Sequence, residues 1–107
     1  MPVVTIEFDK QAVSTDDVQK LADASHEIVS RITEIKDVPV YANSSDITAK
    51  IGPIEIFVRL SDHKIKDLDK LTADLTKGFS DWKKEQNFTH PINMSVIPMN
   101  WKIVIGI

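Results

Sequence analysis

The chain of 107 residues contains no cysteine and only three glycines. Without cysteine it has no disulfide framework, no thiol nucleophile and no thiolate ligand for a metal. The three isolated glycines do not form a glycine-rich phosphate loop. No apolar run approaches the ~18 residues of a membrane span, and the first residues lack the basic-then-apolar pattern of a signal peptide. We therefore expect a cytoplasmic protein with no membrane partner.

Acidic residues slightly outnumber basic ones. The net charge is −3, and the 13 lysines and arginines form no basic block, which disfavours nucleic acid as a partner. The three histidines, His26, His63 and His90, do not form a cluster with metal-ligand spacing. The sequence therefore predicts no metal site and no cofactor.

What the sequence does contain is an internal repeat with an offset of 50 positions. Alternating apolar residues of one half recur in the other: Val4, Ile6 and Phe8 correspond to Ile54, Ile56 and Val58. A stripe at helical spacing recurs as well: Val18, Leu21, Ser25, Val29 and Ile32 correspond to Leu68, Leu71, Leu75, Phe79 and Trp82. Each half therefore predicts a strand followed by an amphipathic helix whose stripe, Trp82 included, packs in the core.

The expected helix starts follow from capping residues. Ser14 or Thr15 is suited to cap the first helix, which has two aspartates in its first turn. For the second helix, expected from about Lys64 to Glu85, the cap is Asp62 or Ser61.

Extended segments are expected after each helix. Residues 39–41 and 46–51 follow the first helix, and residues 92–97 follow the second, with Pro98 ending that strand. Each half is then strand, helix, strand, so residues 1–51 and 52–107 are two β-α-β repeats of a single domain. The expected fold class is α+β, a four-stranded sheet with both helices on one face.

The last residues, 102–107, form a short apolar strand at the chain end. An exposed edge of that composition invites aggregation, so we expect it to pair with a neighbouring subunit. The alternative is that it folds back as a fifth strand of its own sheet.

Pro2 opens the first strand, and its chemistry depends on Met1. If Met1 is removed, as a small following residue favours, the ring nitrogen of Pro2 becomes a free secondary amine. An α-amino group titrates near neutral pH, and burial lowers its pKa further, so this nitrogen would be a proton acceptor. The alternative is an ordinary proline at the start of a strand.

With Met1-Pro2 heading the first strand, two β-α-β halves and an apolar terminal strand, the chain resembles the tautomerase superfamily. That superfamily includes 4-oxalocrotonate tautomerase, macrophage migration inhibitory factor and a bacterial branch of unknown function, and residues 92–101 resemble the last long strand and turn of the macrophage factor. The resemblance implies a homotrimer that encloses a barrel of sheets, with sites between subunits. It also implies keto-enol isomerisation of a small 2-oxo acid with Pro2 as general base.

The resemblance further implies groups that bind a small carboxylate ligand. Lys36 lies in a loop comparable to the one that carries a lysine in the macrophage factor. Asn93 and Ser95 fall where that protein has a tyrosine and an asparagine. The arginine that precedes the first helix cap in the 4-oxalocrotonate enzymes is replaced by Val13.

Two further cations are candidates from their own positions. Arg59 ends the third strand and is suited to bind a carboxylate, an ion pair with Asp62 being the alternative. Lys50 precedes the turn at residues 51–53 and is a similar candidate.

Trp101 follows a turn. We expect its aromatic ring either to plug the end of the barrel, to line a pocket or to pack on a neighbouring subunit.

Three functions remain open from the sequence. The first is the proline-based tautomerase. The second is a non-enzymatic trimer that keeps the fold, favoured by Val13 and by the loss of the aromatic residue at Asn93. The third is an unrelated ferredoxin-like sensor of small molecules, because two β-α-β halves also describe that fold.

Overall fold

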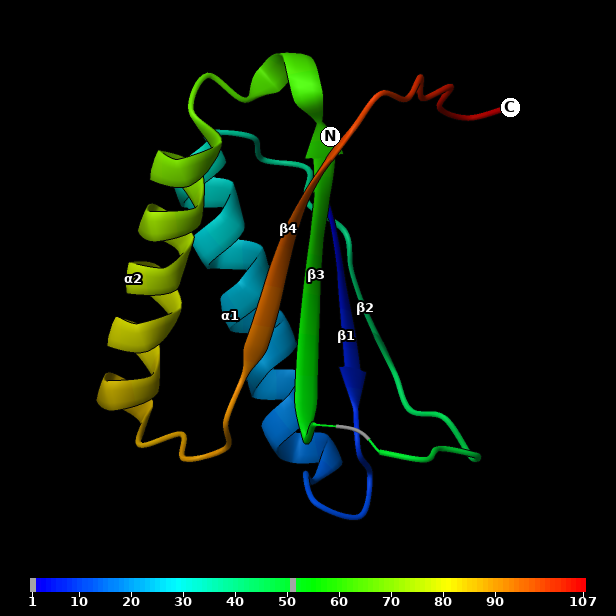
Figure 1. Ribbon diagram of the computed structural model, residues 1–107, viewed down its shortest axis with the longest axis vertical. Helices are drawn as coiled ribbons and strands as arrows, with labels where there is room; N and C mark the ends of the chain where they lie inside the picture. Colours follow the sequence, from blue (N-terminus) through cyan, green and yellow to red (C-terminus); the bar gives the residue numbers. More distant parts are fainter. Residues whose placement is uncertain (1, 51) are drawn as a thin grey trace.

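The computed structural model describes residues 2–50 and 52–107. Their elements are, in chain order, β1 (Val3–Phe8), α1 (Thr15–Thr33), β2 (Val40–Asn43), β3 (Ile54–Ser61), the 3₁₀ helix η1 (Asp62–Lys64), α2 (Leu68–Gln86) and β4 (Asn93–Met99) (Figure 1). The four strands form one sheet in the order β2-β1-β3-β4. The central pair β1–β3 is antiparallel, and both outer pairs are parallel.

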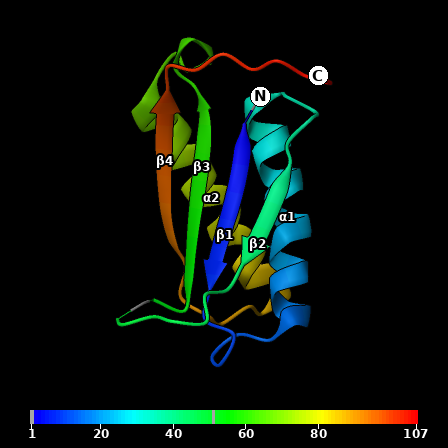
Figure 2. The ribbon, with the colours of Figure 1, turned by 90° about the vertical axis from the view of Figure 1, so that its right-hand side faces the viewer.

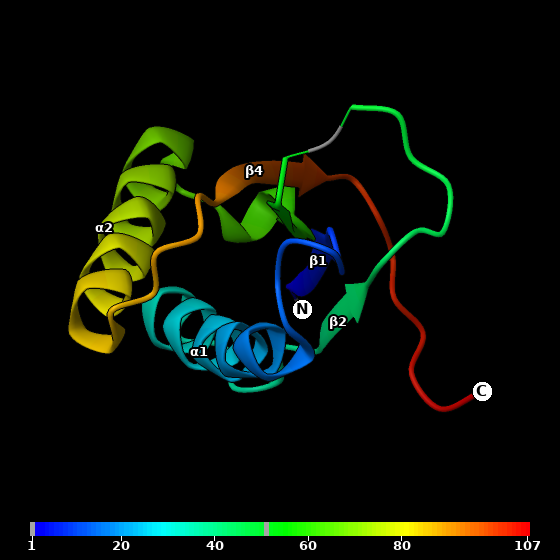
Figure 3. The same cartoon turned by 90° about the horizontal axis from the view of Figure 1, so that it is seen from below.

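Both helices cover one face of this sheet and leave the other face open (Figures 2 and 3). Each parallel pair is the product of one strand-helix-strand half, β1-α1-β2 and β3-α2-β4. The α+β architecture and the two β-α-β repeats predicted from the sequence are therefore confirmed.

The core lies between the sheet and the helices. Alternate strand residues face it with 0% exposure: Val4, Ile6, Ile54, Ile56 and Val58. The helices contribute buried residues from the repeated stripes, among them Leu21, Val29, Leu75 and Phe79, while Trp82 is partly buried against the same core. Leu68 is the exception in the stripe. It is 39% exposed because it is the first residue of α2.

The first helix begins as predicted, and the second does not. Ser14 caps α1, its Oγ accepting a hydrogen bond from the backbone N–H of Asp17 at 3.1 Å. In α2 the cap is Asp67, whose carboxylate accepts from the backbone N–H of Lys70 at 3.0 Å. Ser61 makes no such side-chain bond, and the residues after it form only the short η1 turn. The expected start at Lys64 was wrong because the residue that caps the helix, Asp67, lies further along the chain.

Two expectations for the extended segments are also corrected. Residues 46–50 form bends rather than a strand, with Asp46 accepting a hydrogen bond from Lys10 at 2.8 Å, and Ile51 lies outside the described residues. The last strand continues through Pro98 to Met99. Proline is tolerated there because β4 is an edge strand, where a missing N–H leaves no partner unsatisfied.

The terminal segment 100–107 has no strand structure in the single chain. It leaves the end of β4 and crosses toward the β2 side without joining the sheet (Figure 2). The alternative of a fifth strand in the same sheet is therefore wrong. Val104 and Ile105 are 71% and 79% exposed. The segment thus leaves apolar side chains without cover from its own chain.

Glycine allows the two helices to approach closely at one point. A Cβ atom on Gly78 of α2 would lie 2.9 Å from the Cγ2 atom of Ile28 in α1.

Neither helix, over the residues described, is long and apolar enough to cross a membrane.

Core burial gives a direct test with a matched control. We expect Ile56→Ala to lower the free energy of unfolding by about 2 to 5 kcal/mol, because it removes a fully buried side chain and leaves a cavity. The same change at Ile47, which is 93% exposed, should stay within about 0.5 kcal/mol. Urea denaturation measures both, and equal losses would contradict the assignment of the core.

Candidate functional site at the start of β1

Pro2 lies at the head of β1 and is less than 2% exposed. The backbone N–H of Val4 donates to the carbonyl of Pro39 at 3.0 Å, which joins the start of β1 to the chain entering β2. On the other side, Val3 is the register partner of Arg59 in β3. The antiparallel register therefore continues with Pro2 beside Leu60.

Several connections meet around Pro2 because of the strand directions. β1 is antiparallel to β3, so the head of β1 lies where β3 ends and η1 begins. The end of α1, the start of α2 and the end of β4 lie at this same end of the sheet (Figure 1). Residues 34–39, 60–67 and 99–104 are thereby brought together with Pro2.

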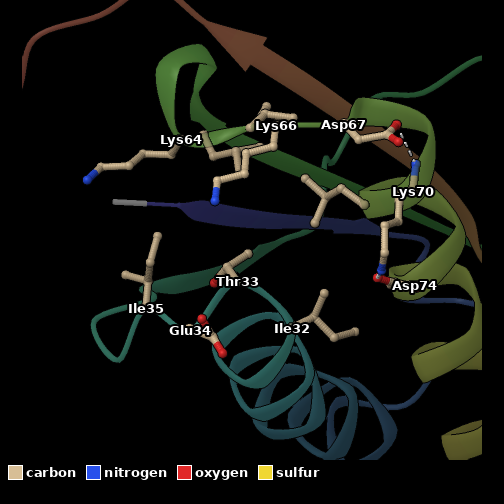
Figure 4. Close-up of a pocket in the computed structure, with 12 residues that line it drawn as sticks. Ile32, Thr33, Glu34, Ile35, Lys64, Lys66, Asp67, Lys70 and Asp74 are labelled. Atoms are coloured by element: carbon tan, nitrogen blue, oxygen red, sulfur yellow. Dashed lines mark hydrogen bonds and ion pairs between the residues drawn. The ribbon is translucent and has the colours of Figure 1, made fainter.

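A cavity of about 360 Å³ lies between the end of α1 and the η1–α2 connection. We call it the helix-side cavity. Figure 4 shows side chains from both helices and from the connection around it. Its apolar residues include Ile32, Leu60, Ile65 and Leu71, and three lysines also line it: Lys64, Lys66 and Lys70.

A second cavity, of about 480 Å³, lies at this end beneath the terminal segment, and we call it the tail-side cavity. It is lined by Ser61, His63, Lys64 and residues 101–104. Ser61 and His63 are hydrogen-bonded, with the Oγ atom 2.8 Å from Nδ1. The nearest carboxylate oxygen, of Asp62, is 3.9 Å from that same nitrogen. Because a catalytic triad needs its serine and carboxylate on opposite ring nitrogens, these residues do not form one.

Trp101 contributes a hydrogen-bond donor to this region. Its Nε1 atom is buried, and no acceptor within the described part of the chain pairs with it. An unsatisfied buried donor is costly unless a ligand, water or another chain supplies an acceptor. Of the three roles expected for Trp101, lining a pocket is the one found within a single chain.

Arg59 is a cation on the open face of the sheet next to this end. Its Nη1 donates to Thr5 Oγ1 at 3.4 Å, and its guanidinium carbon lies 5.2 Å from the centre of the Phe57 ring. The expected alternative, an ion pair with Asp62, is wrong: in residues 2–50 and 52–107 no carboxylate is within 4.0 Å of this guanidinium. Its remaining N–H donors are therefore available to a carboxylate ligand.

The other candidate residues divide between the two ends of the sheet. Lys36 is exposed in the loop at the Pro2 end. Asn93 is in the register row of Glu7 and Glu55 near the other end, about 17 Å along the strand from Pro2, and its amide donates to Glu55 at 3.0 Å. Lys50 lies in the connection at that far end, and Ser95 lies mid-strand beside Phe57. Within one chain, Pro2 is therefore grouped with Arg59 and Lys36, and not with Asn93 or Lys50.

Sequence reasoning missed Lys64, Lys66, Ser61 and His63. The helix start expected at about Lys64 concealed the break between η1 and α2. The available signal was Asp67, an N-cap residue three positions before Lys70.

Among the described residues, no three histidine, aspartate or glutamate side chains come together as a metal site.

No protein-family model and no curated protein sequence matches the chain. Solved structures do. A domain of unknown function from Sebaldella termitidis is 14% identical with a TM-score of 0.68, over 100% of this chain and 98% of that one. Malonate semialdehyde decarboxylase is 7% identical with a TM-score of 0.67, over 97% of this chain and 92% of the enzyme. The macrophage migration inhibitory factor of Trichinella spiralis is 17% identical with a TM-score of 0.59, over 92% and 89%.

These similarities assign the fold. The chain has the fold of the tautomerase superfamily, as its sequence resemblance predicted. This assignment replaces the ferredoxin-like alternative. At such low identity the similarity carries the fold and not an activity.

The position of Trp101 gives a binding test. The chain has two tryptophans, so Trp82→Phe leaves Trp101 as the sole fluorophore and Trp101→Phe leaves Trp82, whose ring packs 5.0 Å from that of Phe88. Titration with malonate, which does not absorb at the excitation wavelength, should change the emission of Trp101 and leave that of Trp82 constant. Equal responses from both variants would argue against a carboxylate site at the Pro2 end.

Proposed function

We propose that this protein is a tautomerase that interconverts the keto and enol forms of a small 2-oxo acid, with the amine of Pro2 as general base. The observation that carries the proposal is the burial of Pro2 at the head of β1. There it is surrounded by connections that bear cations and hydrogen-bond donors. The tautomerase fold, in which the resemblance assigns catalysis to an N-terminal proline, supports it.

The proposal requires that Met1 is removed, because an amide nitrogen does not accept a proton. Once free, the buried secondary amine has its pKa lowered by desolvation, which favours the neutral, basic form near neutral pH. It takes a proton from the carbon beside the substrate carbonyl, and the released electron pair forms the C=C bond. The carbonyl oxygen becomes an enolate and receives the proton back from the Pro2 ammonium. The reverse reaction follows the same steps.

The neighbouring side chains have separate roles in this reaction. Arg59 binds the substrate carboxylate, since the remaining N–H donors of its guanidinium are not paired with any carboxylate of residues 2–50 and 52–107. The N–H of Trp101 and the ammonium of Lys64 stabilise the enolate oxygen in the tail-side cavity. Lys36, on the loop at the same end, adds positive charge that attracts the anionic substrate.

Self-association as a homotrimer completes the site. Lys50, Asn93 and Ser95 lie too far from Pro2 to act with it in one chain, and a neighbouring subunit would bring them to it. The exposed apolar residues of segment 102–107 and the open face of the sheet support such packing. Pairing with a neighbouring subunit would also give segment 102–107 a partner strand, which it lacks in the sheet of its own chain.

A second candidate function is a non-enzymatic trimer with this fold. Two observations favour it. Val13 is 2% exposed, so an apolar residue of the core occupies the position of the arginine in 4-oxalocrotonate enzymes. The Asn93 amide is engaged by Glu55. Proline-dependent turnover would eliminate this candidate.

The catalytic proposal is tested first by mass and then by kinetics. The intact mass of the natively expressed protein should lack one methionine. We expect Pro2→Ala to reduce kcat/KM for phenylpyruvate keto-enol conversion about 10²- to 10⁴-fold, the usual contribution of general acid–base catalysis. Pro91→Ala, an exposed proline at the opposite end of the sheet, is the matched control and should keep wild-type rates. Retention of Met1, or unchanged turnover by Pro2→Ala, sinks the proposal.

The trimer is tested by the mass in solution. The subunit of 12.1 kDa predicts an assembly of about 36 kDa, measured by light scattering after size-exclusion chromatography. Val104→Glu with Ile105→Glu should dissociate it to monomers, because two charges would be buried at the subunit boundary. Lys102→Gln changes the same segment without burying charge and should remain assembled. A monomeric wild type would exclude the trimer.

A further inference from the structure

The helix-side cavity lies next to Pro2, since Leu60 lines it, but among the described residues it shares only Lys64 with the chemistry proposed for Pro2. It lies on the face of the sheet that the helices cover, between α1 and the start of α2 (Figure 4). Arg59 lies on the open face, and Trp101 lines only the tail-side cavity. Of the residues with charged side chains, Lys64 alone lines both cavities, within the described chain.

The floor of this cavity is apolar. Leu60 is 2% exposed, and Ile32, Ile65 and Leu71 are partly buried against the core. Water in contact with such a floor is displaced favourably by an apolar group of a ligand. The volume of about 360 Å³ suits a small molecule and is within the usual range for ligand pockets.

The lining of the cavity carries three lysines, Lys64, Lys66 and Lys70, and three carboxylates, Glu34, Asp67 and Asp74, and the lysines differ in whether they are paired. Lys70 donates to Asp74 at 2.6 Å, and this hydrogen bond raises the pKa of Lys70, so that pair is internally compensated. Asp67 is used as the cap of α2. By contrast, no carboxylate in residues 2–50 and 52–107 is within 4.0 Å of the ammonium of Lys64 or Lys66.

Lys64 and Lys66, the two lysines that no carboxylate of the described residues pairs with, also differ in orientation. Figure 4 shows the Lys66 side chain extending from the η1–α2 connection toward the end of α1, across the cavity, while Lys64 points away. Glu34, at the C-terminal cap of α1, is the remaining carboxylate of the lining. Lys66 therefore places a cation above an apolar floor.

We propose that the helix-side cavity binds a small aliphatic monocarboxylate, its carboxylate held by Lys66 and its chain lying on Leu60 and Leu71. This is a second ligand site, distinct from the substrate site at Pro2. The Lys66 ammonium and the apolar floor together determine which ligand binds. An anion without an aliphatic chain leaves the floor in contact with water, and an aliphatic molecule without an anionic group leaves Lys66 without a partner.

The test is a titration of the isotope-labelled, full-length protein with hexanoate, followed by NMR. Methyl signals of Ile32, Ile65 and Leu71 should shift on binding. Lys66→Gln should weaken the apparent Kd about two- to fivefold, the usual effect of one partly exposed charge. Lys77→Gln, at an exposed lysine of α2 outside the cavity, should leave Kd unchanged. Lys64 is not used because it lines both cavities.

Two comparison probes distinguish the alternatives. Acetate, which lacks the chain, and 1-hexanol, which lacks the charge, should both bind more weakly than hexanoate. Equal binding of acetate or of inorganic phosphate would mean a simple anion site and overturn the proposal. Equal binding of 1-hexanol, an unchanged Kd in Lys66→Gln, or shifts confined to residues 101–104 would overturn it as well. None of these outcomes depends on turnover at Pro2.

Discussion

The antiparallel pairing of β1 with β3 is the constraint on which the rest of the molecule depends. Its register places Val4, Ile6, Ile56 and Val58 on one face, where the helices bury them completely. The same register sets the head of β1 beside the end of β3. The core and the candidate site are thus fixed by the same set of hydrogen bonds. A shift of β1 against β3 by one residue would expose the core residues and would also move Arg59 away from Pro2.

Charge on the open face is graded along this strand pair. Glu7 and Glu55 are register partners at one end, an arrangement of like charges that costs free energy. The Asn93 amide donates to Glu55 and relieves part of that cost. Arg59 lies four residues further along β3, close to Pro2. An anion approaching this face is therefore repelled at one end and attracted at the end where Pro2 lies.

The sequence predicted what depends on local periodicity. The alternating residues of β1 and β3 and the helical stripes identified the repeat, because burial on one face imposes a fixed spacing. The break at 65–67 was not predicted, since Asp62 and Asp67 are both acceptable caps and only packing decides between them. For the candidate site, the sequence named Pro2 and Arg59 separately, and the antiparallel register of β1 and β3 is what places them close together. Lys66 and Trp101 were not assigned there because their positions depend on how η1 and the terminal segment leave the sheet.

The burial of Pro2 also bears on how the protein should be prepared. An affinity tag placed before Pro2 keeps its nitrogen as an amide and must leave from a position less than 2% exposed. Such a preparation would lack the amine that the proposed reaction requires. A tag after the apolar segment 102–107 would instead crowd the surface available for subunit contact. An N-terminal tag that a protease removes directly before Pro2 instead gives the free amine that the proposed reaction requires and adds nothing after segment 102–107.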